Sequence, residues 1–251
     1  MNSSHSGYES EELLSRYLLF HYGAEQDQLP FSFGPHDSLH FPVRCVTECL
    51  AIDVLPSDAA AIDLGCAVGR SSFELSRHCK RVVGIDASHR FIQTAIQLQE
   101  QGEVPYQIVE EGNKSCLRTA VLPAGVKAQA VEFRCCDAMQ ILQESIQYDV
   151  VLAANLICRL PDPKSFLKAL PNILKREGQL ILLSPYSWLE EFTQSSRWLN
   201  SGSSKNSLET MKMLFGKKLR LMRAFDMPFL LREHQRKYEW CVSQASLWRK
   251  S

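Results

Sequence analysis

The chain has 251 residues, of which 45% are hydrophobic, and its 28 lysines and arginines balance 28 aspartates and glutamates. This length and composition predict one α/β domain with an ordinary core and at most a small additional lobe. The absence of net charge argues against a broad basic face for nucleic acid, and no apolar run approaches the roughly 18 residues of a membrane span.

The amino-terminal stretch MNSSHSGYESEELLS has neither the basic start nor the apolar run of a secretory signal. The nine cysteines are odd in number and include no CxxC pair, which favours free thiols in a reducing compartment. The seven histidines are scattered without the spacing of metal ligands, so no metal is predicted. These features indicate a cytoplasmic protein.

Residues 1–57 precede the first predicted strand and contain two helical runs, SEELLSRYLLFHYG and PVRCVTECLAID. The first run is amphipathic, so one of its faces is expected to cover part of the remaining chain. We therefore predict an amino-terminal helical lid over residues 1–57, followed by the main domain over residues 58–251, with both parts forming one compact unit.

Short apolar runs and amphipathic runs alternate after residue 58. This alternation predicts a parallel sheet with helices on both faces and right-handed crossovers. Five strands are predicted at AAIDLGC, RVVGID, AVEFRCCD, YDVVLAANL and GQLILLSPY. Helices are predicted at GRSSFELSRHC, at SHRFIQTAIQLQEQG and at PKSFLKALPNILKREG, with a kink or break at Pro171 in the last of them.

The last two long runs, KLRLMRAFDMPFLLREH and KYEWCVSQASLWRK, have no helix between them and predict an antiparallel hairpin at the sheet edge. The expected fold is therefore a Rossmann-like α/β domain with a seven-stranded, mostly parallel sheet and a carboxy-terminal antiparallel hairpin. Residues 103–129 are interpreted as an insertion with little periodicity, and residues 195–206 as a polar loop.

The turn after the first predicted strand reads D-L-G-C-A-V-G-R, from Asp63 to Arg70. Ligands of open parallel sheets bind at the carboxyl ends of the strands, so this turn is the expected site. A dinucleotide loop normally has the pattern GxGxxG and a helix amino terminus that is free for a pyrophosphate. Here Ala67 replaces the second glycine, and Asp63 adds a negative charge that a pyrophosphate disfavours.

S-adenosylmethionine carries no phosphate, and both its amine and its sulfonium are cationic, so a neighbouring acid favours it. Acids end three of the predicted strands, which is the pattern of class I methyltransferases. We expect Asp86 to accept hydrogen bonds from the ribose diol and Asp137 to meet the adenine amine. The predicted cofactor contacts are Asp63, Gly65, Cys66, Ala67, Gly69, Asp86, Ala87, Asp137, Ala138 and Asn155.

Several phrases outside this turn carry a more specific similarity: LLSRYLLFHYGAE, FGPHDSLHFPVRCVTECL, VVLAANLICRLPDP, SPYSWLEEFT and FLLREHQRKYEWCVSQASLWRK. Together with the turn they closely resemble the 5-thiohistidine (4-mercaptohistidine) N-methyltransferase domain of ovothiol biosynthesis. The resemblance extends from about Tyr8 to Arg249 and is weakest over residues 103–129. In many members this domain follows an iron-dependent sulfoxide synthase, a part that this chain lacks.

The resemblance implies methyl transfer from S-adenosylmethionine to a ring nitrogen of 5-thiohistidine, giving ovothiol A and S-adenosylhomocysteine. It also implies the sulfoxide synthase and the lyase of the same pathway as functional partners. The small-molecule substrate is then the expected partner, with neither nucleic acid nor membrane involved.

Five residues are candidates for substrate contacts. Asn155 follows the fourth predicted strand, where its amide can bind a ring nitrogen, and Arg159 can pair with a carboxylate. Tyr186 ends the fifth strand, Arg44 is the amino-terminal candidate for a carboxylate of substrate or cofactor, and Tyr17 lies on the first helix. Each also has an ordinary structural interpretation as a cap, a surface charge or a core aromatic residue.

Four further side chains have the same two interpretations. His21 and Tyr22 lie on the first helix, where an isolated histidine or tyrosine is as consistent with packing as with binding. Glu233 and His234 belong to REHQRKYEW between the last two strands. A charged cluster in a turn is typically solvated, although this one would also reach the site from the sheet edge.

Three other functions are compatible with the sequence. One is a methyltransferase for another small molecule, RNA or a protein; the others are a non-catalytic S-adenosylmethionine-binding protein and a hydride-transferring reductase. The balanced charge disfavours RNA, the three strand-end acids disfavour a decayed site, and the turn disfavours a reductase. A fold does not determine a substrate, so the choice of 5-thiohistidine depends on the resemblance.

Overall fold

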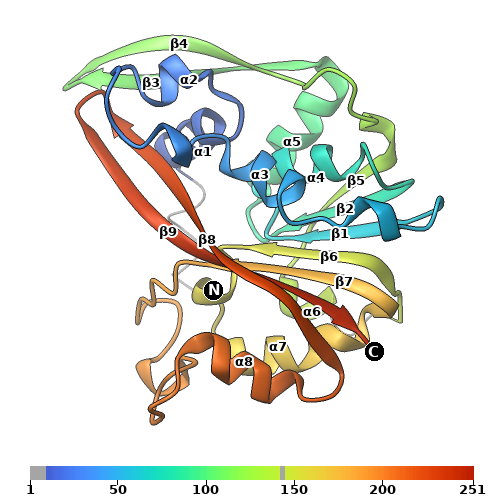
Figure 1. The fold of residues 1–251 in the computed structure, drawn as a ribbon. Helices are drawn as coiled ribbons and strands as arrows, with labels where there is room; N and C mark the ends of the chain where they lie inside the picture. The colour runs from blue at the N-terminus through green and yellow to red at the C-terminus, as the bar shows by residue number, and fades with distance from the viewer. Residues whose placement is uncertain (1–9, 142–144) are drawn as a thin grey trace.

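The computed structural model describes residues 10–141 and 145–251, which are built around a seven-stranded sheet of order β5-β2-β1-β6-β7-β9-β8 (Figure 1). The first five strands in this order are parallel, and the last two pair antiparallel at one edge. The predicted Rossmann-like sheet with its carboxy-terminal hairpin is confirmed. Its strands are β1 (Ala60–Leu64), β2 (Arg81–Asp86), β5 (Val131–Cys135), β6 (Tyr148–Ala154), β7 (Leu174–Ser184), β8 (Leu219–His234) and β9 (Lys237–Lys250).

Helices cover both faces of this sheet (Figure 1). Successive side chains of a strand point to opposite faces, so Val82 joins one hydrophobic core while Val83 joins the other. Burial on both faces explains why the central strands are predominantly apolar. One face carries α1 (Glu11–Tyr22), α2 (Glu25–Gln28), α3 (Phe41–Thr47), α4 (Arg70–Leu75) and α5 (His89–Gln101), and the other carries α6 (Ala138–Ile141), α7 (Pro163–Ala169) and α8 (Ser207–Phe215).

Local hydrogen bonds explain where the two longest helices begin and end. The Ser10 hydroxyl accepts from the Leu13 amide and the Ser88 hydroxyl accepts from the Phe91 amide, both at 3.2 Å. Gly102 ends α5 in the left-handed conformation with φ of 80°. Single 3₁₀ turns lie at His36–Ser38, Ile52–Val54, Ala128–Ala130, Ile157–Arg159, Leu170–Asn172 and Ser195–Arg197.

The expectation of little periodicity over residues 103–129 is wrong. This region forms a separate antiparallel hairpin, β3 (Glu103–Glu111) and β4 (Lys114–Val121). On β3, buried Val104, Tyr106 and Ile108 alternate with exposed residues. This is the pattern of a strand with one packed face, and it was readable in the sequence.

The helices also differ from expectation at three places in the chain. α4 ends at Leu75 and does not extend to Cys79. The predicted break at Pro171 is confirmed, but the chain after it enters β7 at Leu174 and does not resume a helix. α8 was not predicted, although Asn206 and Glu209 form a capping box at its start, a recognisable helix signal.

The amino-terminal helices are held by the β3–β4 hairpin and the tip of the β8–β9 hairpin, beside which they lie in Figure 1. Arg118 pairs with Asp27 at 2.8 Å, and Arg232 donates to the backbone oxygens of Asp27 and Val109 at 2.6 and 3.2 Å. At the other end of α1, the Tyr22 hydroxyl donates to the Val68 oxygen at 2.7 Å.

The first nine residues of the predicted lid segment lie outside the described residues, and the division at residue 57 stays a prediction. No helix within the described ranges is long and apolar enough to cross a bilayer.

The β3–β4 hairpin offers a test of this packing. Tyr106 is 5% exposed and belongs to the core, whereas Leu117 on β4 is 66% exposed. Tyr106→Ala is expected to lower the free energy of unfolding by about 3 kcal/mol because it leaves a cavity. Leu117→Ala is the matched control, expected to change it by no more than about 0.5 kcal/mol. Urea denaturation measures both, and equal effects would contradict the packing of this hairpin.

Candidate functional site

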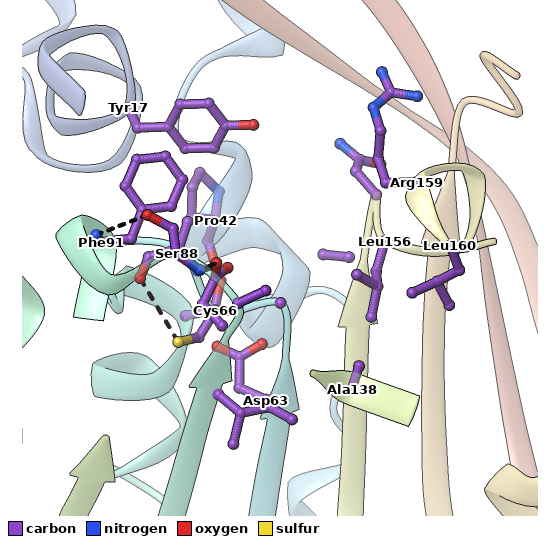
Figure 2. Close-up of a pocket in the computed structure, with 18 of the residues that line it drawn as sticks. Tyr17, Pro42, Asp63, Cys66, Ser88, Phe91, Ala138, Leu156, Arg159 and Leu160 are labelled. Carbon is purple, nitrogen blue, oxygen red and sulfur yellow. Dashed lines mark hydrogen bonds between the residues drawn. The ribbon is translucent and has the colours of Figure 1, made fainter. Parts of the chain in front are cut away.

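A cavity of about 410 Å³ lies at the carboxyl ends of the parallel strands (Figure 2). The turn between β1 and α4 forms part of its lining. α1 and α3 contribute Tyr17 and Pro42, whereas Arg159 comes from the segment that follows β6. The site is thus at the position that the topology of an open parallel sheet predicts.

The carboxylate of Asp86 organises the floor of the cavity. One oxygen accepts from the Ala67 amide at 3.0 Å and the other accepts from the Ser88 amide at 2.9 Å. The backbone oxygen of Asp86 in turn accepts from the Cys136 amide at 3.0 Å. One residue therefore fixes the turn after β1, the start of α5 and the segment after β5 relative to one another.

Four amides of the β1–α4 turn, including that of Ala67, are already used within the protein. Those of Gly65 and Cys66 donate to the Ile85 oxygen at 2.8 and 2.9 Å, and that of Gly69 donates to the Cys66 oxygen at 2.9 Å. Gly69 has φ of 84°, and a Cβ there would lie 2.6 Å from the Phe133 ring. A turn whose amides are already bonded in this way is poorly suited to a pyrophosphate.

Asp63 places a carboxyl group beneath this turn. It is 2% exposed, and it accepts a hydrogen bond from the Ser72 hydroxyl at 2.7 Å. Burial raises its pKa to about 7, the Ser72 hydrogen bond opposes this rise, and the negative charge of Asp86 adds to it. A buried carboxyl in this state is stabilised as an anion by a bound cation.

The predicted cofactor residues come together in the cavity, with one exception. Gly69 is absent from the lining because it begins α4 and packs against Phe133. Asp137 lies at the far side and accepts from the Met139 amide at 2.8 Å. The residues that line the cavity are Asp63, Gly65, Cys66, Ala67, Asp86, Ala87, Asp137, Ala138 and Asn155.

Three of the five predicted substrate residues also line the cavity. Tyr17 packs on Phe91 with ring centroids 4.8 Å apart, and Figure 2 shows it across the cavity from Arg159. Arg159 donates to the Ser187 oxygen at 2.7 Å. Asn155 has φ of 56° and accepts a hydrogen bond from the Ser243 hydroxyl at 2.6 Å.

Arg44 and Tyr186 lie outside the cavity lining, which contradicts their predicted contacts. Arg44 donates to Glu48 at 2.6 Å and to the Pro228 oxygen at 3.1 Å, so its guanidinium joins α3 to β8. The Tyr186 hydroxyl donates to Gln244 at 3.0 Å, and burial raises its pKa. Both side chains serve packing, the ordinary structural interpretation.

The charged turn between β8 and β9 is also directed elsewhere. Glu233 pairs with Lys237 at 2.8 Å, and the His234 ring accepts from the Arg236 amide at 3.3 Å. Neither Glu233 nor His234 lines the cavity. Tyr22 is likewise structural, because its hydroxyl is bonded to the Val68 oxygen.

No motif in the sequence singles out the aromatic residues that complete the cavity. Phe20 of α1, Phe41 of α3 and Phe229 of β8 all line it and pack on one another, with Phe41 and Phe229 centroids 4.9 Å apart. Only the apolar alternation of Met227, Phe229 and Leu231 along β8 is a local signal. Contacts between such distant segments depend on the tertiary fold.

Residues 62–182 match the protein family described as "Methyltransferase domain". The chain contains a class I S-adenosylmethionine-dependent methyltransferase domain. Its cofactor is S-adenosylmethionine, as the three strand-end acids predict.

Two solved structures have a similar fold. They are N-methyltransferase NodS from Bradyrhizobium japonicum WM9 with S-adenosyl-L-homocysteine, and magnesium protoporphyrin IX methyltransferase from Synechocystis PCC 6803 with bound S-adenosylmethionine. Each has a TM-score of 0.53 and 16% identity, and each comparison covers 96% of this chain and 98% of the other.

A shorter similarity links this methyltransferase to 23S rRNA (uracil(1939)-C(5))-methyltransferase RlmD of Legionella pneumophila. The two are 26% identical over 72 residues, which are 27% of this chain and 16% of that enzyme. So short a match carries no inference about the substrate of this protein.

The residues present fit S-adenosylmethionine. Asp63 supplies a buried acid for a cationic ligand, and the bonded amides of the turn match a ligand without phosphate. Asp86 and Asp137 both line the cavity, as is expected of the acceptors for the ribose diol and the adenine amine. The Cys66 thiol is buried and its pKa is raised, so it remains protonated beside the ligand.

The raised pKa of Asp63 predicts a pH-dependent affinity. We expect ionised Asp63 to bind the cofactor amine, so the affinity for S-adenosylhomocysteine should fall as the pH drops below about 7. The slope approaches about tenfold per pH unit, since one proton competes with one ligand. Calorimetry between pH 6 and 8 measures this slope, and Asp63→Asn is expected to remove it. An unchanged slope in this variant would contradict the assignment to Asp63.

The same group gives a matched prediction for stability. Folding raises the pKa of Asp63 above its ordinary value, so this carboxyl stabilises the folded state below about pH 4 and loses that contribution as the pH rises towards 7. Asp63→Asn should therefore raise the melting temperature of the ligand-free protein at pH 8 more than at pH 5.

Proposed function

We propose that this methyltransferase transfers a methyl group from S-adenosylmethionine to an imidazole ring nitrogen of 5-thiohistidine, giving ovothiol A and S-adenosylhomocysteine. The observation that carries the proposal is the composition of the cavity beyond the cofactor residues. An aromatic wall from Phe20, Phe41 and Phe229 is combined with the amide of Asn155 and the guanidinium of Arg159. This combination suits a small heteroaromatic amino acid.

Asn155 is the candidate for selecting the reacting ring nitrogen. Its amide oxygen is taken by the hydroxyl of buried Ser243, which leaves the amide nitrogen to donate to a substrate. The backbone supports this role, because φ of 56° is a conformation that asparagine tolerates better than most residues. A donor to one ring nitrogen fixes the tautomer and directs the other nitrogen towards the methyl group.

Arg159 is the candidate for the substrate carboxylate. Its guanidinium donates to the Ser187 oxygen and lies 5.3 Å from the centroid of the Phe192 ring. These contacts reduce its freedom before a ligand arrives, so less conformational entropy is lost on binding. Tyr17 stands on the opposite wall and offers a hydroxyl to the same ligand (Figure 2).

The chemistry requires alignment more than acid–base catalysis. When bound, S-adenosylmethionine supplies a methyl group that its sulfonium already activates. Transfer would form a nitrogen–carbon bond as the carbon–sulfur bond breaks, with the electron pair left on sulfur, and the ring proton would leave afterwards. Alignment of reacting groups can contribute up to roughly 7–11 kcal/mol. The aromatic wall and Asn155 would supply that alignment for the ring.

Mass spectrometry of the purified protein with S-adenosylmethionine tests this function. Incubation with 5-thiohistidine is expected to add one methyl group and release S-adenosylhomocysteine, whereas histidine in a parallel sample tests whether the sulfur is required. Transfer to neither compound, with the cofactor still bound, would refute the substrate proposal and leave the methyltransferase domain in place.

Asn155→Gly tests the role of the amide without straining a backbone in the left-handed region. We expect kcat to fall about 100-fold through loss of ring alignment, while the Kd of S-adenosylhomocysteine changes by less than about threefold. Asn172→Ala, at an exposed position in the turn after α7, is the matched control. Normal turnover by Asn155→Gly would show that the ring is held elsewhere.

A further inference from the structure

His21 lies in the last turn of α1 and lines the cavity, yet it takes no part in the mechanism above. It is 9% exposed, and its Nδ1 is buried without a hydrogen-bond partner among the described residues. Burial lowers its pKa to about 3, and the charge of Arg70 contributes to this shift. The imidazole is therefore neutral at any pH near 7.

The enclosure of Nδ1 determines the tautomer. A buried N–H without an acceptor is rarer in proteins than a buried acceptor without a donor, so the hydrogen belongs on Nε2. His21 lines the cavity, and its Nδ1 is enclosed by protein. The ring nitrogen that faces the cavity is therefore Nε2. His21 consequently offers a neutral N–H donor to a ligand.

Neighbouring rings hold this donor in place. The imidazole centroid is 5.9 Å from that of Tyr17 and 5.4 Å from that of Phe20. The adjacent Tyr22 is anchored to the Val68 oxygen of the β1–α4 turn, and the Arg70 guanidinium lies 5.9 Å from the Tyr22 ring centroid. His21 is thus fixed next to the turn rather than near Arg159.

The end of the cavity next to the turn is suited to an amino acid. Pro42 and Cys45 of α3 and Ser71 of α4 enclose it, and Asp63 lies beneath it. The Ser71 hydroxyl is already used as a donor to the Pro42 oxygen at 2.8 Å. An anionic group of a ligand would meet the N–H donor of His21 and the positive charge of nearby Arg70. A cationic group of the same ligand would meet the carboxylate of Asp63.

The cofactor has such a pair at one end. With its ribose at Asp86 and its adenine towards Asp137, its amino-acid end extends in the other direction, over the β1–α4 turn. We propose that the Nε2–H of His21 donates a hydrogen bond to the carboxylate of the cofactor, while Asp63 binds its ammonium group. His21 then couples the amino-terminal helix α1 to the presence of the complete cofactor.

The test compares two ligands of the same protein by calorimetry: S-adenosylhomocysteine, and 5′-methylthioadenosine, which lacks the amino-acid end. His21→Phe keeps an aromatic ring between Tyr17 and Phe20 but removes the donor. We expect it to weaken S-adenosylhomocysteine 10- to 100-fold, the effect of one hydrogen bond to a charged group, and to leave 5′-methylthioadenosine within about twofold.

His21→Gln is the rescue variant, because its amide nitrogen reaches about as far as Nε2. It should bind S-adenosylhomocysteine within about threefold of the unsubstituted protein. Equal weakening of both ligands by His21→Phe would overturn the proposal and assign His21 to packing of α1. Unchanged affinity for both would overturn it as well. No methyl acceptor is used, so the result does not depend on whether 5-thiohistidine is the substrate.

Discussion

The binding site depends on one residue, Asp86, that links three strand ends through its carboxylate and its backbone oxygen. Asp86 accepts from the amides of Ala67 and Ser88, and its backbone oxygen accepts from Cys136. Hydrogen bonds to an ionised group are the stronger ones, so this carboxylate holds the turn after β1 against the start of α5. We propose that the same residue, besides organising the floor, binds the ribose of the cofactor.

A second feature of the site is that two titratable side chains are buried in the cavity, where water cannot fully solvate them. Asp63 lies beneath the turn with its pKa raised, and His21 lines the same cavity with its pKa lowered. Both shifts arise mainly from burial, which costs stability in the ligand-free protein. A zwitterionic ligand would offset that cost if its ammonium group met Asp63 and its carboxylate met His21. The burial that destabilises the empty site therefore favours binding of the complete cofactor.

The parallel sheet, its antiparallel edge and most residues of the turn side of the cavity follow from the sequence, because strand-end acids and apolar runs are local signals. The β3–β4 hairpin differs from expectation although the alternation of Val104, Tyr106 and Ile108 is also a local signal. The contacts of Arg44 and Tyr186 could not be predicted from the sequence. Their hydrogen-bond acceptors, Pro228 and Gln244, lie on strands that are distant in the chain. Phe41 and Phe229 meet in the cavity for the same tertiary reason.

A crystal structure of the protein with S-adenosylhomocysteine tests the central role of Asp86 most directly. Both ribose hydroxyls should lie within hydrogen-bonding distance of its carboxylate, with the amides of Ala67 and Ser88 still bonded to it. The adenine should then lie beside Asp137 and Ala138. A ribose bound away from Asp86, or a carboxylate rotated out of its contacts with the turn, would contradict this organisation of the site.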